Sequence, residues 1–150
     1  TNEKVGKLDN RFGELIEHLM APGIAERFSE LGYHFDEVTH PFGFKFKQNG
    51  IVVAQADILL ENPTTIIVIE IKVKPEERDV KQLLTKMLNI RKYYEHDPTK
   101  NIKTLSGALA GAIFPKQVKE SALKSGFFVI TQKGDTVKID IPKEFKPREF

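Results

Sequence analysis

The chain has 150 residues, 40% of them hydrophobic and 29% charged, and its formal net charge is +2. These values are typical of one globular domain that can bury a sizeable core. Cysteine is absent, which excludes disulfides and thiolate metal sites. No apolar run approaches the roughly 20 residues of a membrane span, and the first residues lack the apolar core of a signal peptide. We therefore expect a cytoplasmic protein that does not contact a membrane.

The first segment, residues 1–20, has the pattern of a heptad helix. Its apolar residues alternate between spacings of three and four, and they are Val5, Leu8, Phe12, Leu15 and Leu19. Such a stripe is typical of a coiled coil and predicts a homodimer through the N-terminal helix. Pro22 and Gly23 predict an interruption of this helix, after which a second helical piece ends at Gly32.

The middle of the chain predicts three strands. Residues 42–47 alternate phenylalanine with glycine or lysine, which is the period of a strand with one buried face. The sequence Gln-Asn-Gly that follows is a hairpin turn, and a second strand covers 51–60. A turn at 61–65 leads to a third strand over 66–73, which is dense in β-branched residues.

A long helix and a buried strand are predicted next. Pro75 opens the helix, which ends near His96. Its predicted inward face consists of Val80, Leu84, Met87, Leu88 and Arg91. Residues 105–114 are apolar and rich in alanine and glycine, as in a strand that is covered on both faces by a parallel crossover.

The C-terminal region adds a helix over 116–124 and a hairpin of strands 127–131 and 136–141. The polar tail, residues 142–150, is expected to be loose. The whole order is α, β, β, β, α, β, α, β, β, which predicts an α/β fold. We expect the heptad helix to precede a domain over 21–141, whose core also includes the end of that helix from about residue 11.

Glu70-Ile71-Lys72 is the segment that points to chemistry. Residues two apart in a strand point the same way, so Glu70 and Lys72 share one face while Ile71 faces the other. A charged pair in so apolar a strand needs partners, because unpaired buried charge is costly. A hairpin centred on the 61–65 turn pairs residues whose numbers sum to about 127, and this places Asp57 opposite Glu70. We expect the side chains of Asp57, Glu70 and Lys72 to cluster on the sheet face turned toward the first helix.

Two readings of this cluster are open. Two carboxylates close together repel each other, and a divalent cation relieves that repulsion. Oxygen ligands suit Mg²⁺ or Mn²⁺ and not zinc, so Asp57 and Glu70 are candidate metal ligands. The alternative is a structural ion pair, in which Lys72 neutralises Glu70 or Asp57. The preceding Asp, the hairpin spacing and the helix that follows favour the metal site.

The arrangement of Asp57, Glu70-Ile71-Lys72 on the next strand and a crossover helix resembles the PD-(D/E)XK nuclease superfamily. The Gly-x-x-x-Glu sequence that ends at Glu17, with the later Leu-Gly-Tyr, is similar to the first helix of Holliday-junction-resolvase-like members. The segments Arg-Phe-Gly-Glu, Ala-Pro-Gly and Ala-Gly-Ala-Ile-Phe-Pro also resemble uncharacterised bacterial proteins with a heptad-rich N-terminal region. The resemblance implies a restriction-endonuclease-like αβββαβ core with a mixed central sheet, here with an extra C-terminal helix and hairpin.

The resemblance also implies roles for the matching residues. Asp57 and Glu70 would hold Mg²⁺ or Mn²⁺ together with the backbone carbonyl of Ile71. Lys72 would orient the attacking water or stabilise the charge of the phosphorane, and Glu17 would add a carboxylate from the first helix. The alternative for Glu17 is an exposed helical glutamate.

A glutamine on the helix after the E-x-K segment serves some relatives, and Gln82 is the candidate here. It lies about 200° from Val80 on the helical wheel, opposite the predicted inward face. Ala56 stands where many relatives have proline before the first acidic residue.

Two functions from different classes follow. The first is a divalent-metal-dependent nuclease that hydrolyses phosphodiester bonds of DNA, with RNA left open as a substrate. Residues 76–150 have 15 Lys and Arg against 10 Asp and Glu, while residues 1–75 have 8 against 11, so the basic second half could meet a phosphate backbone. The second function is a non-catalytic nucleic-acid- or protein-binding module of the same fold that self-associates through its N-terminal helix.

Overall fold

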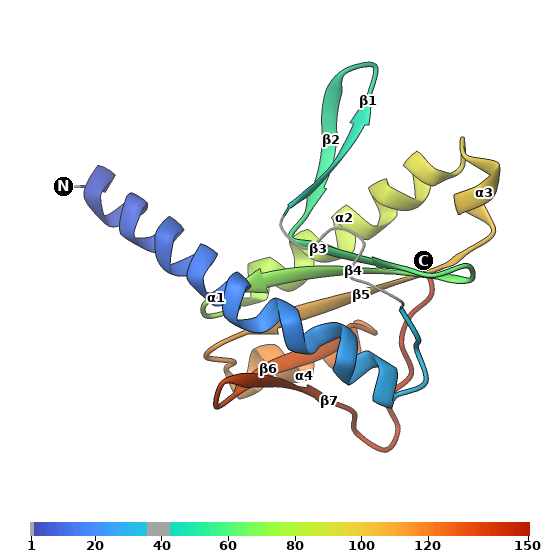
Figure 1. Cartoon of the computed structure of the whole chain (residues 1–150). Helices are drawn as coiled ribbons and strands as arrows, with labels where there is room; N and C mark the ends of the chain where they lie inside the picture. The colour runs from blue at the N-terminus through green and yellow to red at the C-terminus, as the bar shows by residue number, and fades with distance from the viewer. Residues whose placement is uncertain (1, 36–42) are drawn as a thin grey trace.

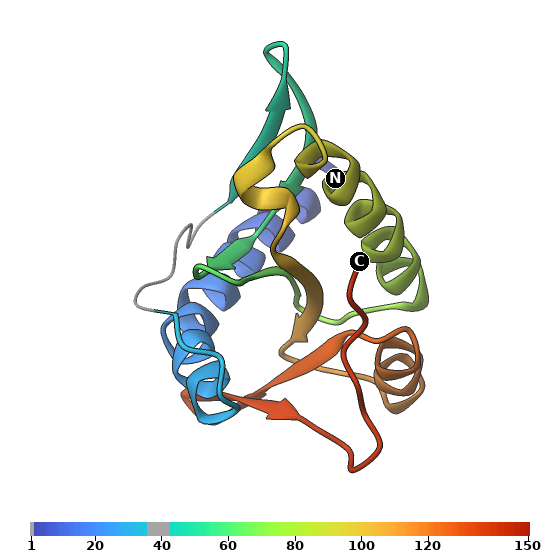
Figure 2. The same ribbon diagram turned by 90° about the vertical axis from the view of Figure 1, so that its right-hand side faces the viewer.

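The computed structural model describes residues 2–35 and 43–150, with side chains for residue 11 and, within those ranges, from residue 13 onward. A central five-stranded sheet has α1 (Asn2–Glu30) on one face (Figures 1 and 2). The other face carries α2 (Glu77–Tyr94) and α4 (Lys116–Lys124). A separate two-stranded hairpin stands off from this body (Figure 1).

The central sheet has the order β3-β4-β5-β6-β7. Its strands are β3 (Ile58–Glu61), β4 (Thr65–Lys72), β5 (Thr104–Gly111), β6 (Phe128–Lys133) and β7 (Thr136–Asp140). β3–β4 and β6–β7 are antiparallel hairpins, whereas β4, β5 and β6 run parallel through crossovers that contain α2 and α4. A short α3 (Pro98–Asn101) follows α2. The predicted α/β class and mixed central sheet are confirmed, as are the helix over 116–124 and the C-terminal hairpin. The αβββαβ order holds except that its second strand is divided in two and α3 is added after α2.

The strand predicted over 51–60 is two strands. β2 (Ile51–Ala56) pairs with β1 (Phe44–Gln48) in the separate hairpin, and β3 resumes in the central sheet beyond Asp57. The chain bends at Asp57 because this residue serves the backbone on both sides: its carboxylate accepts from the N–H of Ile71 at 2.7 Å, and its carbonyl from Gly43 at 2.8 Å. The apolar residues on both sides of Asp57 conceal this bend in the sequence.

α1 is one continuous helix, and the interruption predicted at Pro22 and Gly23 is wrong. Its large buried residues recur every four positions and pack on the sheet; they are Ile16, Met20, Ile24 and Phe28. This packing outweighs the hydrogen bond that Pro22, which is exposed, removes from the helix. Gly23 is a contact residue, because a Cβ there would lie 2.9 Å from Oγ1 of Thr136 on β7.

The heptad stripe of α1 faces away from the domain where it is described. Leu15 is 51% exposed and Leu19 46%. The side chains of Val5, Leu8 and Phe12 lie outside the described residues. Within the described part of the chain, no helix has both the length and the apolar character that crossing a membrane requires.

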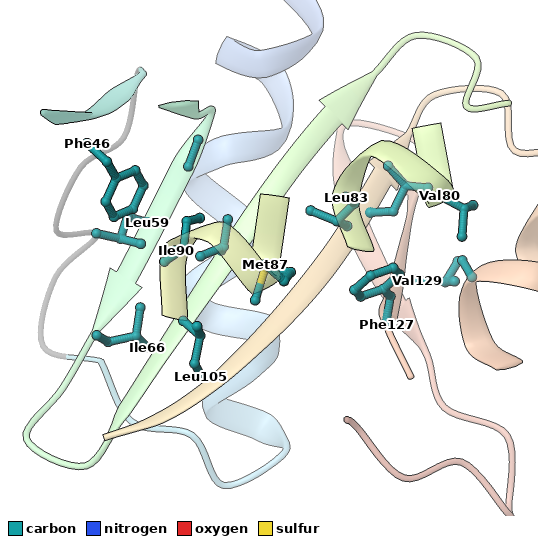
Figure 3. Close-up of a cluster of buried hydrophobic side chains, with 14 of the residues drawn as sticks. Phe46, Leu59, Ile66, Val80, Leu83, Met87, Ile90, Leu105, Phe127 and Val129 are labelled. Atoms are coloured by element: carbon teal, nitrogen blue, oxygen red, sulfur yellow. The ribbon is translucent and has the colours of Figure 1, made fainter. Parts of the chain in front are cut away.

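The inward face of α2 differs from the predicted one. Its buried residues are Val80, Leu83, Met87, Ile90 and Tyr94, and Figure 3 shows four of them directed at the sheet. Leu88, predicted to face inward, is 49% exposed. Arg91 lies beside this face, and its guanidinium donates to the carbonyls of Asn101, Lys103 and Phe150.

The C-terminal tail is not loose, contrary to the prediction from its polarity. The amide of Phe150 donates to the carbonyl of Leu105 at 2.8 Å, and its ring stacks on Phe127 with centroids 5.9 Å apart. The guanidinium of Arg148 lies 4.4 Å from the centre of the Phe150 ring. The amide of Arg148 also donates to the carbonyl of Gly126 at 2.9 Å. Two backbone hydrogen bonds and the Phe127–Phe150 contact therefore hold a segment that its polar composition predicts to be mobile.

Candidate active site

The β3–β4 hairpin brings Asp57 to Glu70. Its register pairs Ile58 with Ile69 and Leu59 with Val68, as predicted from the centre of the turn. Asp57 directly precedes the first paired residue of β3, so the same register places it beside Glu70. Its hydrogen bond to the amide of Ile71 fixes the carboxylate there.

Glu70 and Lys72 lie on the sheet face that meets α2, whereas we predicted the face toward the first helix. Along β4, Ile66 and Val68 pack in the cluster that includes α2. Ile67, Ile69 and Ile71 pack in the cluster that includes α1. Alternation places Glu70 on the same face as Ile66 and Val68. The contact of Lys86 on α2 with Glu70 agrees with this. The prediction was wrong because charge alone does not say which helix covers which face.

α1 still reaches the site, because it passes the C-terminal end of β4 (Figure 1). A cleft of about 390 Å³ opens there. Its lining consists of Gly13, Glu14, Glu17, Asp57, Ile71, Lys72 and Val73. Glu70 lies outside this lining, so the cleft exposes Asp57, Glu17 and Lys72 while Glu70 supports them from the side of α2.

Glu17 is perturbed by its neighbours. Partial burial, the charge of Asp57, a hydrogen bond with the Asp57 carboxyl group and the charges of Glu70 and Glu14 together raise the pKa of Glu17 to about 7. Two carboxyl groups that share a hydrogen bond must hold a proton between them. Glu17 is half-buried and lines the cleft with Gly13, so it is not the exposed helical glutamate of the alternative interpretation.

Glu70 has a partner that sequence reasoning missed. Nζ of Lys86, on α2, lies 2.9 Å from a carboxylate oxygen of Glu70, with the two side chains 23% and 14% exposed. Burial raises the pKa of Glu70, and the charge of Asp57 adds to this effect, against the opposing charges of Lys86 and Lys72. The signal for Lys86 was its spacing, because it lies three residues after Leu83 and four before Ile90.

Lys72 is half-buried and lines the cleft. Among the described side chains, none forms a salt bridge with it. Its charge acts on Glu70 from a distance and lowers the pKa of that group. The ion pair that sequence analysis considered for Lys72 is thus made by Lys86, and the Lys72 ammonium is available to a ligand in the cleft.

Gln82 is not brought to the site. It is exposed and does not line the cleft, as its angle on the helical wheel predicted. Lys86, one turn later on the same side of α2, makes the contact with Glu70 that a helix residue was expected to supply.

The carboxylate oxygens of the site are the type of ligand that a hard cation such as Mg²⁺ prefers. They are not arranged as a complete coordination shell. No group of three His, Cys, Asp or Glu side chains within the described ranges is spaced to hold a metal ion. One oxygen of Glu70 is bonded to Lys86, and one of Asp57 to the amide of Ile71. The crowding of Glu17, Asp57 and Glu70 nevertheless raises pKa values in the way that a divalent cation relieves.

Comparison with known proteins adds little to this geometry. No protein-family model matches the chain, and no curated protein does. Among solved structures, a chain of the EndoMS–dsDNA2 complex is similar, with 21% identity and a TM-score of 0.42. The alignment covers 72% of this chain and 44% of that one, so this chain spans less than half the length of its structural neighbour. The fold assignment therefore stands on the strand order and register.

Proposed function

We propose that the domain is a divalent-metal-dependent nuclease of the PD-(D/E)XK type that hydrolyses phosphodiester bonds of DNA. One observation carries the proposal: Asp57 from the β2–β3 bend, Glu17 from α1 and Lys72 from β4 line one cleft. Glu70 adjoins them. A structural role would have paired these charges, yet two of the carboxyl groups have raised pKa values and no described residue pairs with Lys72. Such perturbed groups in a cleft are typical of functional sites.

The position of each residue in the cleft determines its proposed role. Asp57, Glu70 and the Ile71 carbonyl would hold Mg²⁺ or Mn²⁺, which supplies an activated water and neutralises phosphate charge when bound. Lys72 would donate a hydrogen bond to a phosphate oxygen from the wall of the cleft, where charge develops in the transition state. Glu17 adds an oxygen from the opposite wall. Lys86 holds Glu70 in place through its 2.9 Å contact.

The test is cleavage of duplex, single-stranded, flap and junction DNA, and of RNA, with Mg²⁺, with Mn²⁺ and with EDTA. Asp57→Asn keeps the size of the side chain and removes its charge, so it should abolish cleavage. Asp135→Asn is the matched control, because Asp135 is exposed in the β6–β7 turn, and it should cleave like the unaltered protein. No metal-dependent cleavage of any substrate, or equal cleavage by both variants, would refute the proposal.

A binding module that self-associates is the alternative, and the half-exposed Leu15 and Leu19 favour it. Two leucines on one outward face of a helix are a surface that a second copy can cover. We expect a dimer in light scattering at high micromolar concentration, and a monomer after Leu15→Ser with Leu19→Ser. Leu88→Ser, on an exposed site of α2, should leave the dimer intact. A monomeric unaltered protein would remove the case for self-association.

A further inference from the structure

The β1–β2 hairpin is built as an arm. It forms a sheet of its own and extends from the body (Figures 1 and 2). Its turn places Asn49 and Gly50 at φ of 54° and 79°, the left-handed pair that a tight two-residue hairpin turn requires. Residues 43–56 contain two lysines and no acidic residue. The arm is therefore purely cationic among its ionisable groups.

One face of the arm anchors it. Phe46 is fully buried, and its ring lies 5.4 Å from that of Tyr93 and 5.7 Å from that of Tyr94 on α2. Phe44 packs edge-on against Phe46 at 4.7 Å. These aromatic contacts fix the angle between the arm and the domain, so the arm is a positioned element.

The other face is exposed, and we call it the outer face of the arm. It consists of Lys45, Lys47, Val52 and Gln55, which the register of the two strands places together. Next to it, the exposed turn adds the side chain of Asn49. Ammonium groups, amides and one branched apolar side chain therefore share a narrow, two-stranded ribbon.

We propose that the outer face of the arm enters the major groove of duplex DNA. A major groove about 12 Å wide admits a two-stranded β-ribbon. Lys45 and Lys47 would bind the flanking phosphates, while the amide of Gln55 meets base edges and Val52 meets the methyl group of thymine. The deep, narrow major groove of duplex RNA does not admit a ribbon. The inference rests on the proposed function for the class of ligand, a nucleic acid, and adds that it is B-form and double-stranded.

The end of the arm that joins the domain directly adjoins Asp57 of the candidate active site. β2 runs through Ala56 into Asp57, and the N–H of Gly43 at the start of β1 donates to the Asp57 carbonyl at 2.8 Å. Six residues of strand extend about 20 Å, which sets the reach from the cleft to the tip. If the arm lies in the major groove, the DNA backbone is held at a fixed distance from Asp57 and Lys72.

Fluorescence anisotropy in EDTA, where metal-dependent cleavage cannot run, separates binding from catalysis. The double variant Lys45→Gln with Lys47→Gln should weaken binding of a labelled DNA duplex on the order of tenfold at about 0.1 M salt. It should also reduce the slope of log K against log salt by about two. Lys133→Gln with Lys143→Gln is the matched control, since both lysines are exposed elsewhere, and it should change affinity little.

Each outcome decides one proposal separately. Equal losses in the two double variants, equal losses on duplex RNA, or no duplex binding by the unaltered protein would overturn the arm proposal. If duplex binding depends on the arm but no metal-dependent cleavage occurs, the arm proposal stands and the nuclease proposal fails. If cleavage occurs and the Lys45/Lys47 variant cleaves and binds duplex DNA normally, the nuclease proposal stands and the arm proposal fails.

Discussion

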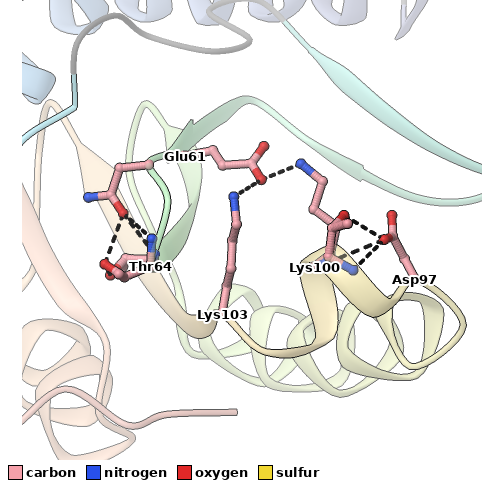
Figure 4. A network of polar contacts seen from close by, with 8 residues as sticks. Glu61, Thr64, Asp97, Lys100 and Lys103 are labelled. Carbon is pink, nitrogen blue, oxygen red and sulfur yellow. Dashed lines mark hydrogen bonds and ion pairs between the residues drawn. The ribbon is translucent and has the colours of Figure 1, made fainter.

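The β3–β4 hairpin has Glu61 at its turn end and the candidate site at its open end. The pKa of the acidic side chains is shifted in opposite directions at the two ends. At the turn end, Glu61 accepts from Lys100 and Lys103, the latter at 2.7 Å (Figure 4). Burial by itself would raise the pKa of Glu61, but these two hydrogen bonds and charges outweigh it, so the pKa lies below its usual value. At the open end, burial and crowding raise the pKa of Glu17 and of Glu70.

The two ends differ in the number of lysine partners for each carboxyl group and not in the type of acidic residue. Around Glu61, two ammonium groups serve one carboxylate, so the charges satisfy each other within the fold. Around Asp57, the carboxyl groups of Glu17 and Glu70 crowd together, and among the described side chains a lysine forms an ion pair with Glu70 alone of these three. An acidic surplus that the fold does not neutralise is what a cation from outside the chain can use. The first end is therefore a closed ion network, and the second supports the proposed metal site.

The largest expected effect is on cleavage. Lys72→Ala should reduce the rate by about 100-fold to 1,000-fold, as loss of a donor to transition-state charge does, and leave the melting temperature and Mn²⁺ affinity nearly unchanged. Lys103→Ala at the other end should do the reverse and lower the melting temperature while cleavage survives. Rates under saturating Mn²⁺ and calorimetry of both variants provide the measurement. Loss of stability without loss of rate in Lys72→Ala would erase the distinction between the two ends.

A smaller effect is expected from Glu61→Gln, which keeps the shape of the side chain and leaves two lysines without their acceptor charge. We expect a loss of about 1–2 kcal/mol, or roughly 3–6 °C in melting temperature. Because the pKa of Glu61 is lowered on folding, its contribution is present above the unfolded value of 4.5 and fades as the pH falls below it. The gap between variant and parent should therefore narrow in melts at pH values progressively below 4.5; a gap that stays constant as the pH falls would contradict the ion network.

The smallest effect is expected from Glu17→Gln, and it has the opposite sign. The folded protein retains a proton on Glu17 up to about pH 7, whereas the unfolded chain releases it near 4.5. Ionised Glu17 therefore costs stability increasingly as the pH rises between those values. With EDTA at about pH 8, the variant should melt on the order of one or two degrees above the parent, since solvent screens a half-exposed group, and the gain should vanish near pH 4. A lower melting temperature at pH 8 would contradict the crowding.

Sequence patterns predicted what depends on local alternation and on turn centres. The Gln-Asn-Gly turn and the register that pairs Ile58 with Ile69 follow from turn chemistry and from spacing of two, and the buried parallel strand β5 follows from an apolar run rich in alanine and glycine. The approach of Asp57 to Glu70 follows from the same register. These predictions needed no knowledge of what packs against the sheet.

The errors all concern tertiary packing. Pro22 breaks an isolated helix, but the burial of Ile24 and Phe28 on the sheet holds α1 together. Lys86 resembles a solvated helix lysine until Glu70 is placed beneath it. The tail around Phe150 looks mobile until the ring of Phe127 is found to receive it. In each case a partner distant in the sequence decides the outcome. The spacing of Lys86 indicates the side of α2 on which it lies, but it does not identify Glu70 as its partner.

The close approach of Gly23 to Thr136 bears on the order of folding. Each strand of the central sheet pairs with its neighbour in the sequence, so the sheet can grow by steps that each close a moderate loop. α1 docks differently, because Gly23 near one end of the chain meets β7 near the other, and that contact closes a loop of most of the chain. We therefore expect the sheet to form first and α1 to dock late, which makes the wall that carries Glu17 the last part of the cleft to assemble.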